Sequence, residues 1–469
     1  MSNPSLLNAA IAAHRFGLGE PTLQPLANDP QGWLLAQIGP ADPARGSGLM
    51  STREGLELVA AEREKRQLAR NPPPGMTAEQ VLAGHYRDAT IADARSHLLS
   101  AALATRPFAE RLQLFWVNHF TVSLLKGSTR GLVGAFERDA IRPHTAGSFE
   151  ALLIASTTHP TMLRYLDNVQ SAGPNSRVVE RERNRSARAG ETPRVTGINE
   201  NLAREVLELH TLGAASGRAG ESRHGGYSQA DVTAFAGVLT GWRVGRDGAQ
   251  ALVPFDANWH EPGTKTFLGK RYPEGPDALR QVLRDLALHP ATATFVSTKL
   301  ARHFVADEPP PALVERLSAT WLRTGGDLPS VYRELVRSPE AWTAPQQKLK
   351  TPEEFVISSV RVLGVNERQF ERGDGLGIGA LGQRILAAPS PAGWSDRADD
   401  WLGPDAVWKR VEWATRTADR MGRGIDARAL AAQSLGPLLG LATQTQIEHA
   451  ADGPQALALL LMAPEFQRR

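Results

Sequence analysis

The chain has 469 residues, which is enough for two or three average domains or for one large helical body. Hydrophobic residues make up 41% and charged residues 22%, a balance typical of globular proteins and unlike that of disordered or membrane proteins. The 53 basic and 50 acidic side chains leave a net charge of only +3, so nucleic acid is not expected as a partner.

Two further features exclude other classes of protein. The chain contains no cysteine, which rules out disulfides, thiolate nucleophiles and cysteine-ligated metals. No stretch approaches the roughly 18 uninterrupted apolar residues of a membrane span. The first residues, MSNPSLLNAAIAAHRFGLGE, lack the basic start and long apolar run of a signal peptide. We therefore expect a cytoplasmic protein, with periplasmic residence or export beside a partner as the alternative.

Helical periodicity dominates wherever a pattern can be counted, and alternating strands are scarce. We expect a mainly α fold in which residues 1–469 form one large, irregular multi-helix domain with long loops. In YSQADVTAFAGVLTGW, apolar residues follow helical spacing behind a capping box of Ser228 and Asp231. The same periodicity predicts helices in LLNAAIAAHRFG and in the ranges 78–105, 291–305 and 427–462.

Three segments interrupt this pattern. Residues 51–75 form a charged helix that ends in three prolines, and we interpret them as a solvated arm inserted into the body. Residues 173–197 carry six arginines and few apolar side chains, which predicts an inserted, mobile Arg-rich loop. The GDGLGIGALG stretch does not follow a strand or open a clear helix, so no nucleotide cofactor is expected.

The segment NENLAREVLELHTLG predicts a helix with Asn199 as its N-cap and Gly213 as its C-cap. Most of its circumference is apolar, so it should be buried, while one side carries the polar residues Asn201, Glu205 and Glu208. Two buried carboxylates one turn apart repel each other unless a cation, a metal ion or a proton offsets the cost. The pair is therefore either ion-paired, for example with Arg204, or part of a metal or acid–base site.

Two other segments carry candidate groups. FWVNHFTVS places Asn118 and His119 in an aromatic helix, where the imidazole is either a ligand or base or a hydrogen-bonded core histidine. In NWHEPGTKTFLG, a Pro–Gly turn could project His260, Glu261 and Lys265 toward one point, unless it is a plain surface turn. G-x-S-x-G, HExxH and P-loop signatures are absent.

Six blocks in this order resemble the bacterial domain of unknown function 1800 family: FWVNHFTVS, HPTMLRYLDN, NENLAREVLELHTLG with GGYSQADVTAFAGVLTGW, HEPGTKTFLG, KLKTPEEFV and PSPAGW. The resemblance runs from AAHRFGLG to APEFQRR. It implies that the members tend to keep residues matched here by Asn118, His119, Asn201, Glu205, Glu208, His260, Glu261 and Lys265, although aspartate is usual where Glu261 stands. It also implies a sulfatase-like companion protein as partner, but no catalytic assignment.

From these groups we predict a metal-dependent enzyme, either a hydrolase or an oxidoreductase. The expected ligands of a divalent iron, manganese or zinc ion are His119, Glu205, Glu208 and His260. Glu205, Glu208 and Lys265 would act in catalysis, with Asn118, Asn201 and Glu261 in support. Without a metal, Lys265 would lower the pKa of one glutamate in an acid–base cluster. The alternative is a non-catalytic helical protein that binds or assembles with the sulfatase-like companion.

Overall fold

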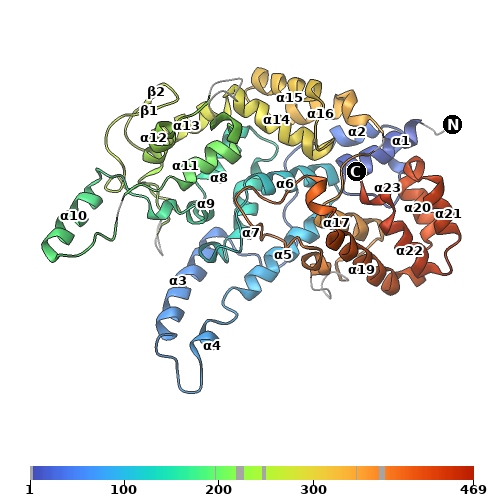
Figure 1. The fold of residues 1–469 in the computed structure, drawn as a ribbon, viewed down its shortest axis with the longest axis horizontal. Coiled ribbons are helices and arrows are strands. Elements are labelled where there is room, and N and C mark those ends of the chain that lie inside the picture. The colour runs from blue at the N-terminus through green and yellow to red at the C-terminus, as the bar shows by residue number, and fades with distance from the viewer. Residues whose placement is uncertain (1–3, 196, 218–225, 246–249, 345, 369–374) are drawn as a thin grey trace.

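A computed structural model describes residues 4–195, 197–217, 226–245, 250–344, 346–368 and 375–469 (Figure 1). Helices dominate these ranges, which confirms the predicted mainly α class. Strands β1 (Lys265–Phe267) and β2 (Lys270–Tyr272) form an antiparallel hairpin in which Lys265 pairs with Tyr272. Within the same ranges, no helix combines the length and the apolar character that a membrane crossing requires.

The described helices range in length from four to 18 residues. Their bounds are α1 (Pro4–Ile11), α2 (Pro30–Leu35), α3 (Thr52–Leu68), α4 (Ala78–Leu82), α5 (Arg87–Ala102), α6 (Pro107–His119), α7 (Val133–Phe136), α8 (Phe149–Thr157), α9 (Pro160–Tyr165), α10 (Arg177–Ala189), α11 (Asn201–Glu205), α12 (Gln229–Leu239), α13 (Asp277–Ala287), α14 (Pro290–Phe304), α15 (Pro311–Thr324), α16 (Leu328–Arg337), α17 (Pro352–Val362), α19 (Pro404–Met421), α20 (Ala427–Leu435), α21 (Leu441–Glu448), α22 (Gly453–Met462) and α23 (Pro464–Gln467).

Two hydrophobic cores lie side by side. The larger core is built from α6, α8, α9 and α11 to α16, and its largest members include Trp116 and Trp321. The second core joins α5, α17 and α19 to α23 around Phe355 and Trp413. Trp116 Nε1 donates a 2.6 Å hydrogen bond to the Tyr332 hydroxyl, so its polar atom is satisfied at full burial. The cores meet at α6 and α17, and this junction positions the site described below.

Local sequence signals locate several helices correctly. Ser228 accepts from the Asp231 amide, and the Asp231 carboxylate accepts from the Ser228 amide, which is the predicted capping box of α12. The range 291–305 forms α14, and the range 427–462 is divided among α20, α21 and α22. These segments combine helical periodicity with capping residues, so both ends of the pattern are marked in the sequence.

The Arg-rich segment 173–197 was predicted as a mobile loop, and that prediction is wrong. Residues 177–189 form α10, which projects from the body at the left of Figure 1. Ser176 caps its start, Gly190 ends it at φ 66°, and Arg185 pairs with Glu182 at 2.9 Å. Charged side chains at helical spacing stabilise an exposed helix without a large apolar face.

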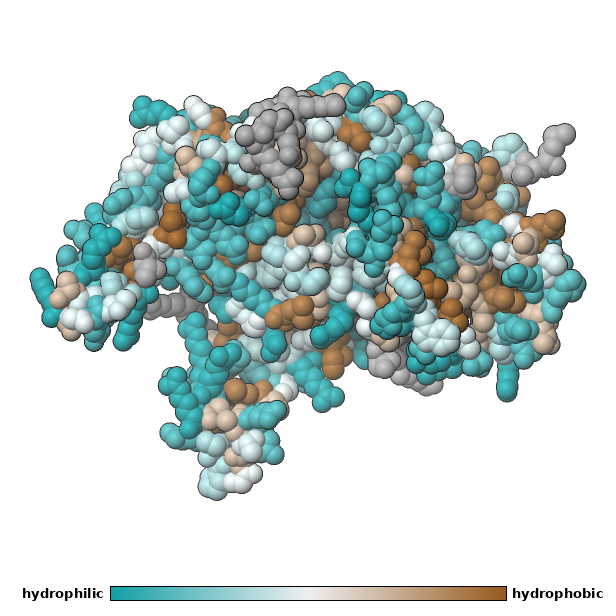
Figure 2. All heavy atoms as spheres, in the orientation of Figure 1, coloured by the Kyte–Doolittle hydropathy of each residue, from teal (hydrophilic) through white to brown (hydrophobic). Residues whose placement is uncertain are grey.

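The charged range 51–75 contains α3, which begins with a capping box formed by Ser51 and Glu54. Together with α4 it projects from the lower side of the body in Figure 1. Hydrophilic side chains cover most of the face shown in Figure 2 and much of this projection. At its base, Val59, Tyr86 and Leu132 form a small third hydrophobic cluster that attaches the projection to the body.

The helix predicted over 199–213 is shorter and less regular than expected. Glu200, not the predicted Asn199, occupies the N-cap position, although Asn199 Oδ1 accepts from the amide of Asn201, the first residue of α11. Gly213 has the expected positive φ of 88°. However, α11 ends at Glu205 and continues as a π-helical turn over Val206–His210. The wider turn changes the direction of the side chains that follow it, so regular spacing of 100° per residue does not apply beyond Glu205.

Candidate functional site

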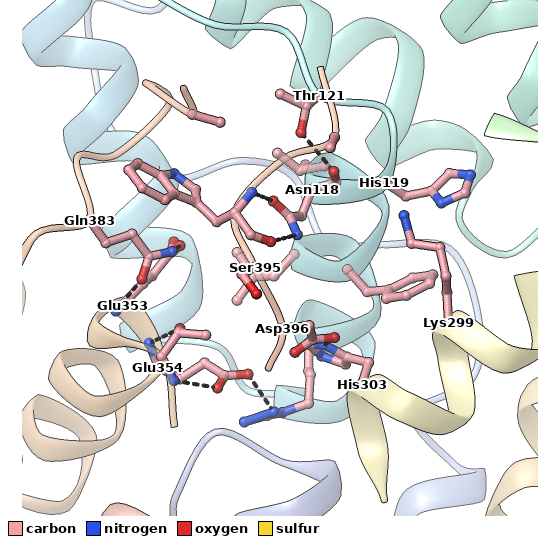
Figure 3. Close-up of a pocket in the computed structure, with 18 of the residues that line it drawn as sticks. Asn118, His119, Thr121, Lys299, His303, Glu353, Glu354, Gln383, Ser395 and Asp396 are labelled. Atoms are coloured by element: carbon pink, nitrogen blue, oxygen red, sulfur yellow. Dashed lines mark hydrogen bonds and ion pairs between the residues drawn. The ribbon is translucent and has the colours of Figure 1, made fainter. Parts of the chain in front are cut away.

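A cavity of about 290 Å³ lies where the two cores meet (Figure 3). Its walls come from α6, α14, the start of α17 and the segment 392–397. The polar side chains among its lining residues are His97, Arg111, Asn118, His119, Thr121, Lys299, Arg302, His303, Thr351, Glu353, Glu354, Gln383, Ser395, Asp396 and Arg397. We call this space the central cavity. Three of the sequence blocks quoted above, FWVNHFTVS, KLKTPEEFV and PSPAGW, contribute to its wall.

Asn118 fixes the segment 392–397 against α6. Its side-chain amide donates to the Trp394 carbonyl at 2.9 Å, and its Oδ1 accepts from the Trp394 amide at 2.8 Å. Gly393 has φ 84°, and a Cβ at this position would lie 2.5 Å from the Asn118 carbonyl oxygen. Only glycine allows this close approach. Asn118, predicted as a supporting residue, thus positions the segment that carries Asp396.

His303 and Asp396 form a hydrogen-bonded pair in the cavity wall (Figure 3). The distance from His303 Nδ1 to Asp396 Oδ2 is 3.0 Å. A carboxylate can only accept, so Nδ1 carries the proton and Nε2 presents its lone pair. In the described part of the chain Nε2 has no hydrogen-bond partner, and the imidazole side chain keeps 11% exposure. Burial lowers the pKa of His303 despite the neighbouring Asp396, so the ring is neutral at pH 7.

Lys299 lies one turn before His303 on α14 and lines the same cavity. The described residues provide no hydrogen bond or ion pair to its ammonium, which lies 5.7 Å from the centre of the Phe295 ring. Burial lowers the pKa of Lys299 to about 8, and the charge of Arg302 acts in the same direction. A ligand with an anionic or carbonyl oxygen would supply the acceptor that this cation lacks.

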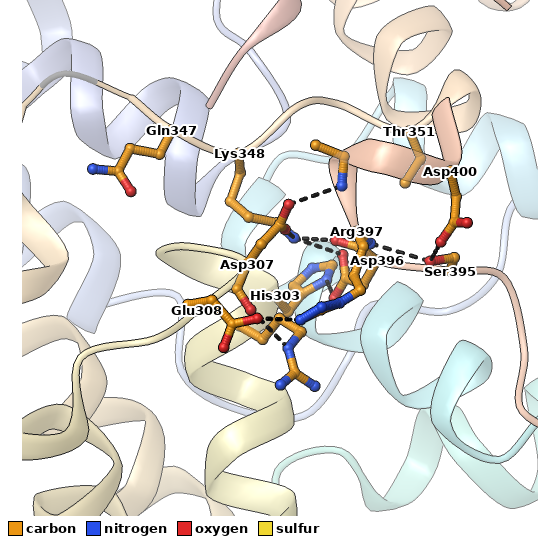
Figure 4. Close-up of polar contacts among 12 residues, drawn as sticks. His303, Asp307, Glu308, Gln347, Lys348, Thr351, Ser395, Asp396, Arg397 and Asp400 are labelled. Carbon is orange, nitrogen blue, oxygen red and sulfur yellow. Dashed lines mark hydrogen bonds and ion pairs between the residues drawn. The ribbon is translucent and has the colours of Figure 1, made fainter. Parts of the chain in front are cut away.

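Asp396 also contacts a network of buried charged side chains (Figure 4). Lys348 Nζ lies 3.7 Å from Asp396 Oδ1 and donates to Asp307 at 2.5 Å. Arg469 reaches Asp396 at 3.5 Å and Glu354 at 2.8 Å. Burial opposes ionisation of Asp396, but His303, Lys348 and Arg469 outweigh it and hold the pKa of this carboxyl well below its usual range. Asp396 therefore remains a hydrogen-bond acceptor for His303 at any ordinary pH.

A second histidine in the wall, His97, has the opposite protonation state. Its Nδ1 lies 2.8 Å from Glu137 and its Nε2 lies 2.5 Å from Glu353, so each nitrogen faces a carboxylate. Burial lowers the pKa of His97, but the two carboxylates outweigh burial and raise it well above 6.5. His97 is therefore an imidazolium that joins α5 to the start of α17.

This imidazolium predicts a specific dependence of stability on pH. Because the folded pKa lies above the unfolded value, the stabilisation by His97 is complete below pH 6.5 and is lost as pH rises through the folded pKa. The difference in unfolding free energy between wild type and His97→Gln should therefore shrink from pH 6.5 to pH 9, by up to about 1.4 kcal/mol per pH unit. Urea titrations at each pH measure it. A difference that stays constant from pH 6.5 to pH 9 would show that folded His97 is already neutral in this range.

His119, a predicted metal ligand, also lines the central cavity. Its Nε2 donates to the His210 carbonyl at 3.1 Å, and in the residues that the structure describes Nδ1 has no partner. Burial lowers the pKa of His119 well below its usual value, and Lys299 and His210 contribute to the same shift. The ring is neutral and packs on Phe115 and Phe120.

Glu205 and Glu208 lie close enough for their charges to interact, although the π-helical turn begins between them. Burial raises the pKa of Glu205, and the charge of Glu208 raises it further. Glu208 hydrogen bonds with the Tyr227 hydroxyl, lies 4.0 Å from Arg204 and keeps 32% exposure of its side chain. The supporting residue Asn201 donates its amide to Asn199 in the first turn. Glu208 thus has Arg204 and Tyr227 as partners, whereas the described residues provide no ion pair within 4 Å to Glu205.

His260, Glu261 and Lys265 do meet at the predicted turn. His260 Nδ1 donates to the Thr240 carbonyl at 2.8 Å, which leaves Nε2 to accept from Lys265 Nζ at 3.0 Å. Burial lowers the pKa of His260 and of Lys265. Both oxygens of Glu261 accept from Asn175, at 2.7 and 2.9 Å. Both ring nitrogens of His260 are therefore occupied by protein groups.

The predicted metal ligands thus lie in three groups of contacts that share no residue within the described ranges. There, no three His, Asp or Glu side chains are placed to hold a metal ion together. The four side chains predicted as ligands are therefore not grouped together in these ranges. The groups that do converge, Lys299, His303 and Asp396, were not assigned to a site from sequence. Their only local signal is the four-residue spacing of Lys299 and His303.

Comparison with known proteins gives a family but no activity. The sequence family described as "Protein of unknown function (DUF1800)" matches residues 11–468. No curated protein and no solved structure matches the chain. Because the family match covers nearly the whole sequence, the chain belongs to the DUF1800 family.

Proposed function

We propose that this protein is an enzyme that uses His303 as a general base in the central cavity. The observation that carries the proposal is the unpaired Nε2 of His303, whose ring is fixed by the Asp396 carboxylate on the other side. A neutral imidazole held by a carboxylate can accept a proton from a water molecule or a substrate hydroxyl. A buried nitrogen without a hydrogen-bond partner destabilises the fold by about 1–3 kcal/mol. A histidine with a purely structural role would gain nothing that offsets this cost.

Lys299 supports the same proposal from its place on α14. An ammonium beside the base would bind an anionic or carbonyl oxygen of the substrate and stabilise the charge that develops there. Hydrolysis of a small polar ester or related compound fits these two roles best. The volume of about 290 Å³ suits a small substrate rather than a polymer segment. The alternative predicted from the sequence, an oxidoreductase, has no comparable support from the side-chain contacts in the central cavity.

Protection of Lys299 tests whether the cavity binds such compounds. With limiting acetic anhydride, the acetylation of Lys299 should rise with a midpoint near pH 8. Lys270, which is exposed beside Asp285, serves as the reference lysine on the surface. A screen of small phosphate, sulfate and carboxylate esters should find compounds that slow acetylation of Lys299 and not of Lys270. The protecting compounds are then assayed for turnover. If no compound protects and none is converted, the enzyme proposal is wrong.

We also propose that the activity depends on a divalent metal ion, which a separate experiment tests. Protein purified without an affinity tag is analysed for iron, manganese and zinc, alongside Glu205→Ala and His260→Ala. A stoichiometric metal that both variants lose while staying folded would support the four ligands predicted from sequence. A metal retained in both variants would place its ligands elsewhere.

A non-catalytic binding or assembly role is the second candidate. It is favoured by exposed apolar side chains around the start of α19, where Trp408 is 62% exposed and Leu402 is 44% exposed. Exposed apolar patches mark protein contacts more often than isolated apolar residues do. The proposed partner is the sulfatase-like companion, in the cytoplasm or exported with it. Loss of co-purification with that companion in Trp408→Ser, with wild-type levels in His303→Gln, would favour this role.

A further inference from the structure

A second cavity of about 510 Å³ lies between the projecting helix α3 and the body. Its lining comes from α3, α9, Val169 and the segments 243–245 and 251–252. None of its lining residues takes part in the central cavity. We call this space the arginine cleft, because Arg53, Arg63, Arg164 and Arg243 all line it.

The charge of the arginine cleft is strongly unbalanced. Among its described lining residues, four carry a guanidinium and only Glu57 carries a carboxylate. Burial lowers the pKa of Arg164, and the charge of the nearby Arg63 lowers it further, whereas Tyr86 and Glu62 act in the opposite direction. Within the described ranges no carboxylate lies within 4 Å of the guanidinium of Arg63 or Arg164. Grouping like charges in a cavity costs free energy unless an anion is bound between them.

Two of the four guanidinium groups are held in fixed orientations. Arg164 Nε donates to the Ser128 carbonyl at 2.6 Å, which anchors the side chain. The guanidinium of Arg243 lies 3.5 Å from the centre of the Trp259 ring and stacks on it. Preorganised guanidinium groups match the paired oxygens of phosphoryl and sulfuryl groups, so less side-chain entropy is lost when such a ligand binds.

We propose that the arginine cleft binds a small ligand with two or more phosphoryl or sulfuryl groups. Arg63 and Arg164 lie near each other without a carboxylate within 4 Å in the described ranges, and two such guanidinium groups favour a ligand with more than one anionic group. The cavity volume is that of an ordinary small-molecule site. The site lies apart from the base at His303, so this inference does not depend on the reaction proposed for the central cavity.

Calorimetric titration with pyrophosphate, inorganic sulfate and citrate tests the proposal. Wild-type protein should bind pyrophosphate more tightly than sulfate or citrate, and the affinity should fall with added salt. Arg63→Gln and Arg164→Gln should each weaken pyrophosphate binding about tenfold or more. Arg63 is exposed, so its replacement leaves the core intact. Arg70→Gln is the matched control, because Arg70 is an exposed arginine of the same projection that does not line the cleft.

Several outcomes would overturn the proposal. Pyrophosphate that fails to bind wild type at millimolar concentration excludes the site. If Arg70→Gln weakened pyrophosphate binding as much as Arg63→Gln does, the effect would come from the overall charge of the protein and not from the cleft. Citrate binding as tightly as pyrophosphate would contradict the class of ligand. Loss of pyrophosphate binding in Lys299→Gln, with Arg63→Gln unaffected, would place the anion in the central cavity instead.

Discussion

Replacing Glu354 by glutamine is expected to destabilise the protein by about 3–5 kcal/mol, the cost of breaking a buried ion pair on one side. Glu354 lies between Arg111 at 2.9 Å and Arg469 at 2.8 Å, and the side chains of all three are at most 8% exposed. The two guanidinium groups outweigh the effect of burial and lower the pKa of Glu354 to about 2. Glutamine keeps the shape but removes the carboxylate between the two buried cations, so that Arg111 loses its ion pair and Arg469 keeps only Asp396, 3.5 Å away.

The measurement is the free energy of unfolding from urea titration at pH 7. Glu308→Gln provides the control, because Glu308 forms an ion pair with Arg397 but keeps 81% exposure of its side chain. Exposed pairs contribute about 0–1 kcal/mol. Similar losses in the two variants would show that the buried network does not hold the two cores together.

His303→Gln is expected to lower kcat by about 10²–10⁴ on the substrate found by protection of Lys299, the usual range for loss of a general base. Glutamine can still contact Asp396 but cannot accept the proton. Lys299→Gln should act mainly on KM, because its ammonium binds the substrate oxygen before any proton moves. Steady-state kinetics on folded variants, checked by circular dichroism, separates the two effects.

Two further variants sharpen this comparison. Asp396→Asn should also lower kcat, since it no longer selects the tautomer with a free Nε2, and it should shift the pH profile. His449→Gln replaces an exposed histidine on the surface and should leave kcat unchanged. Retention of wild-type kcat within about threefold in His303→Gln would exclude His303 as the general base.

The sequence was most informative where structure is local. The capping box of α12 and the periodicity of α14 depend on residues within one or two turns, and both predictions are confirmed. The π-helical turn after Glu205 was missed because an extra residue in one turn has no clear signal in composition or spacing. The helix α10 was missed because its charged composition resembles that of a loop.

The site was less predictable because it depends on packing between distant segments. His260 and Lys265 do meet, since five residues and one turn separate them. The pairing of His303 with Asp396 spans 93 residues, and no local sequence pattern predicts it. Two carboxylates on one helix and two histidines from other segments suggested a metal centre, but the directions of these side chains are set by core packing, which a single sequence does not show.

The wall of the central cavity also bears on how the chain reaches its native state. The contact between Arg111 and Glu354 closes a segment of 243 residues, and that between Glu354 and Arg469 closes one of 115 residues. Such high contact order delays formation, because the entropy of loop closure must be overcome before the contact contributes. We therefore expect the central cavity to form late, after the helices themselves, and a molecule in which the two cores have not docked to lack that cavity.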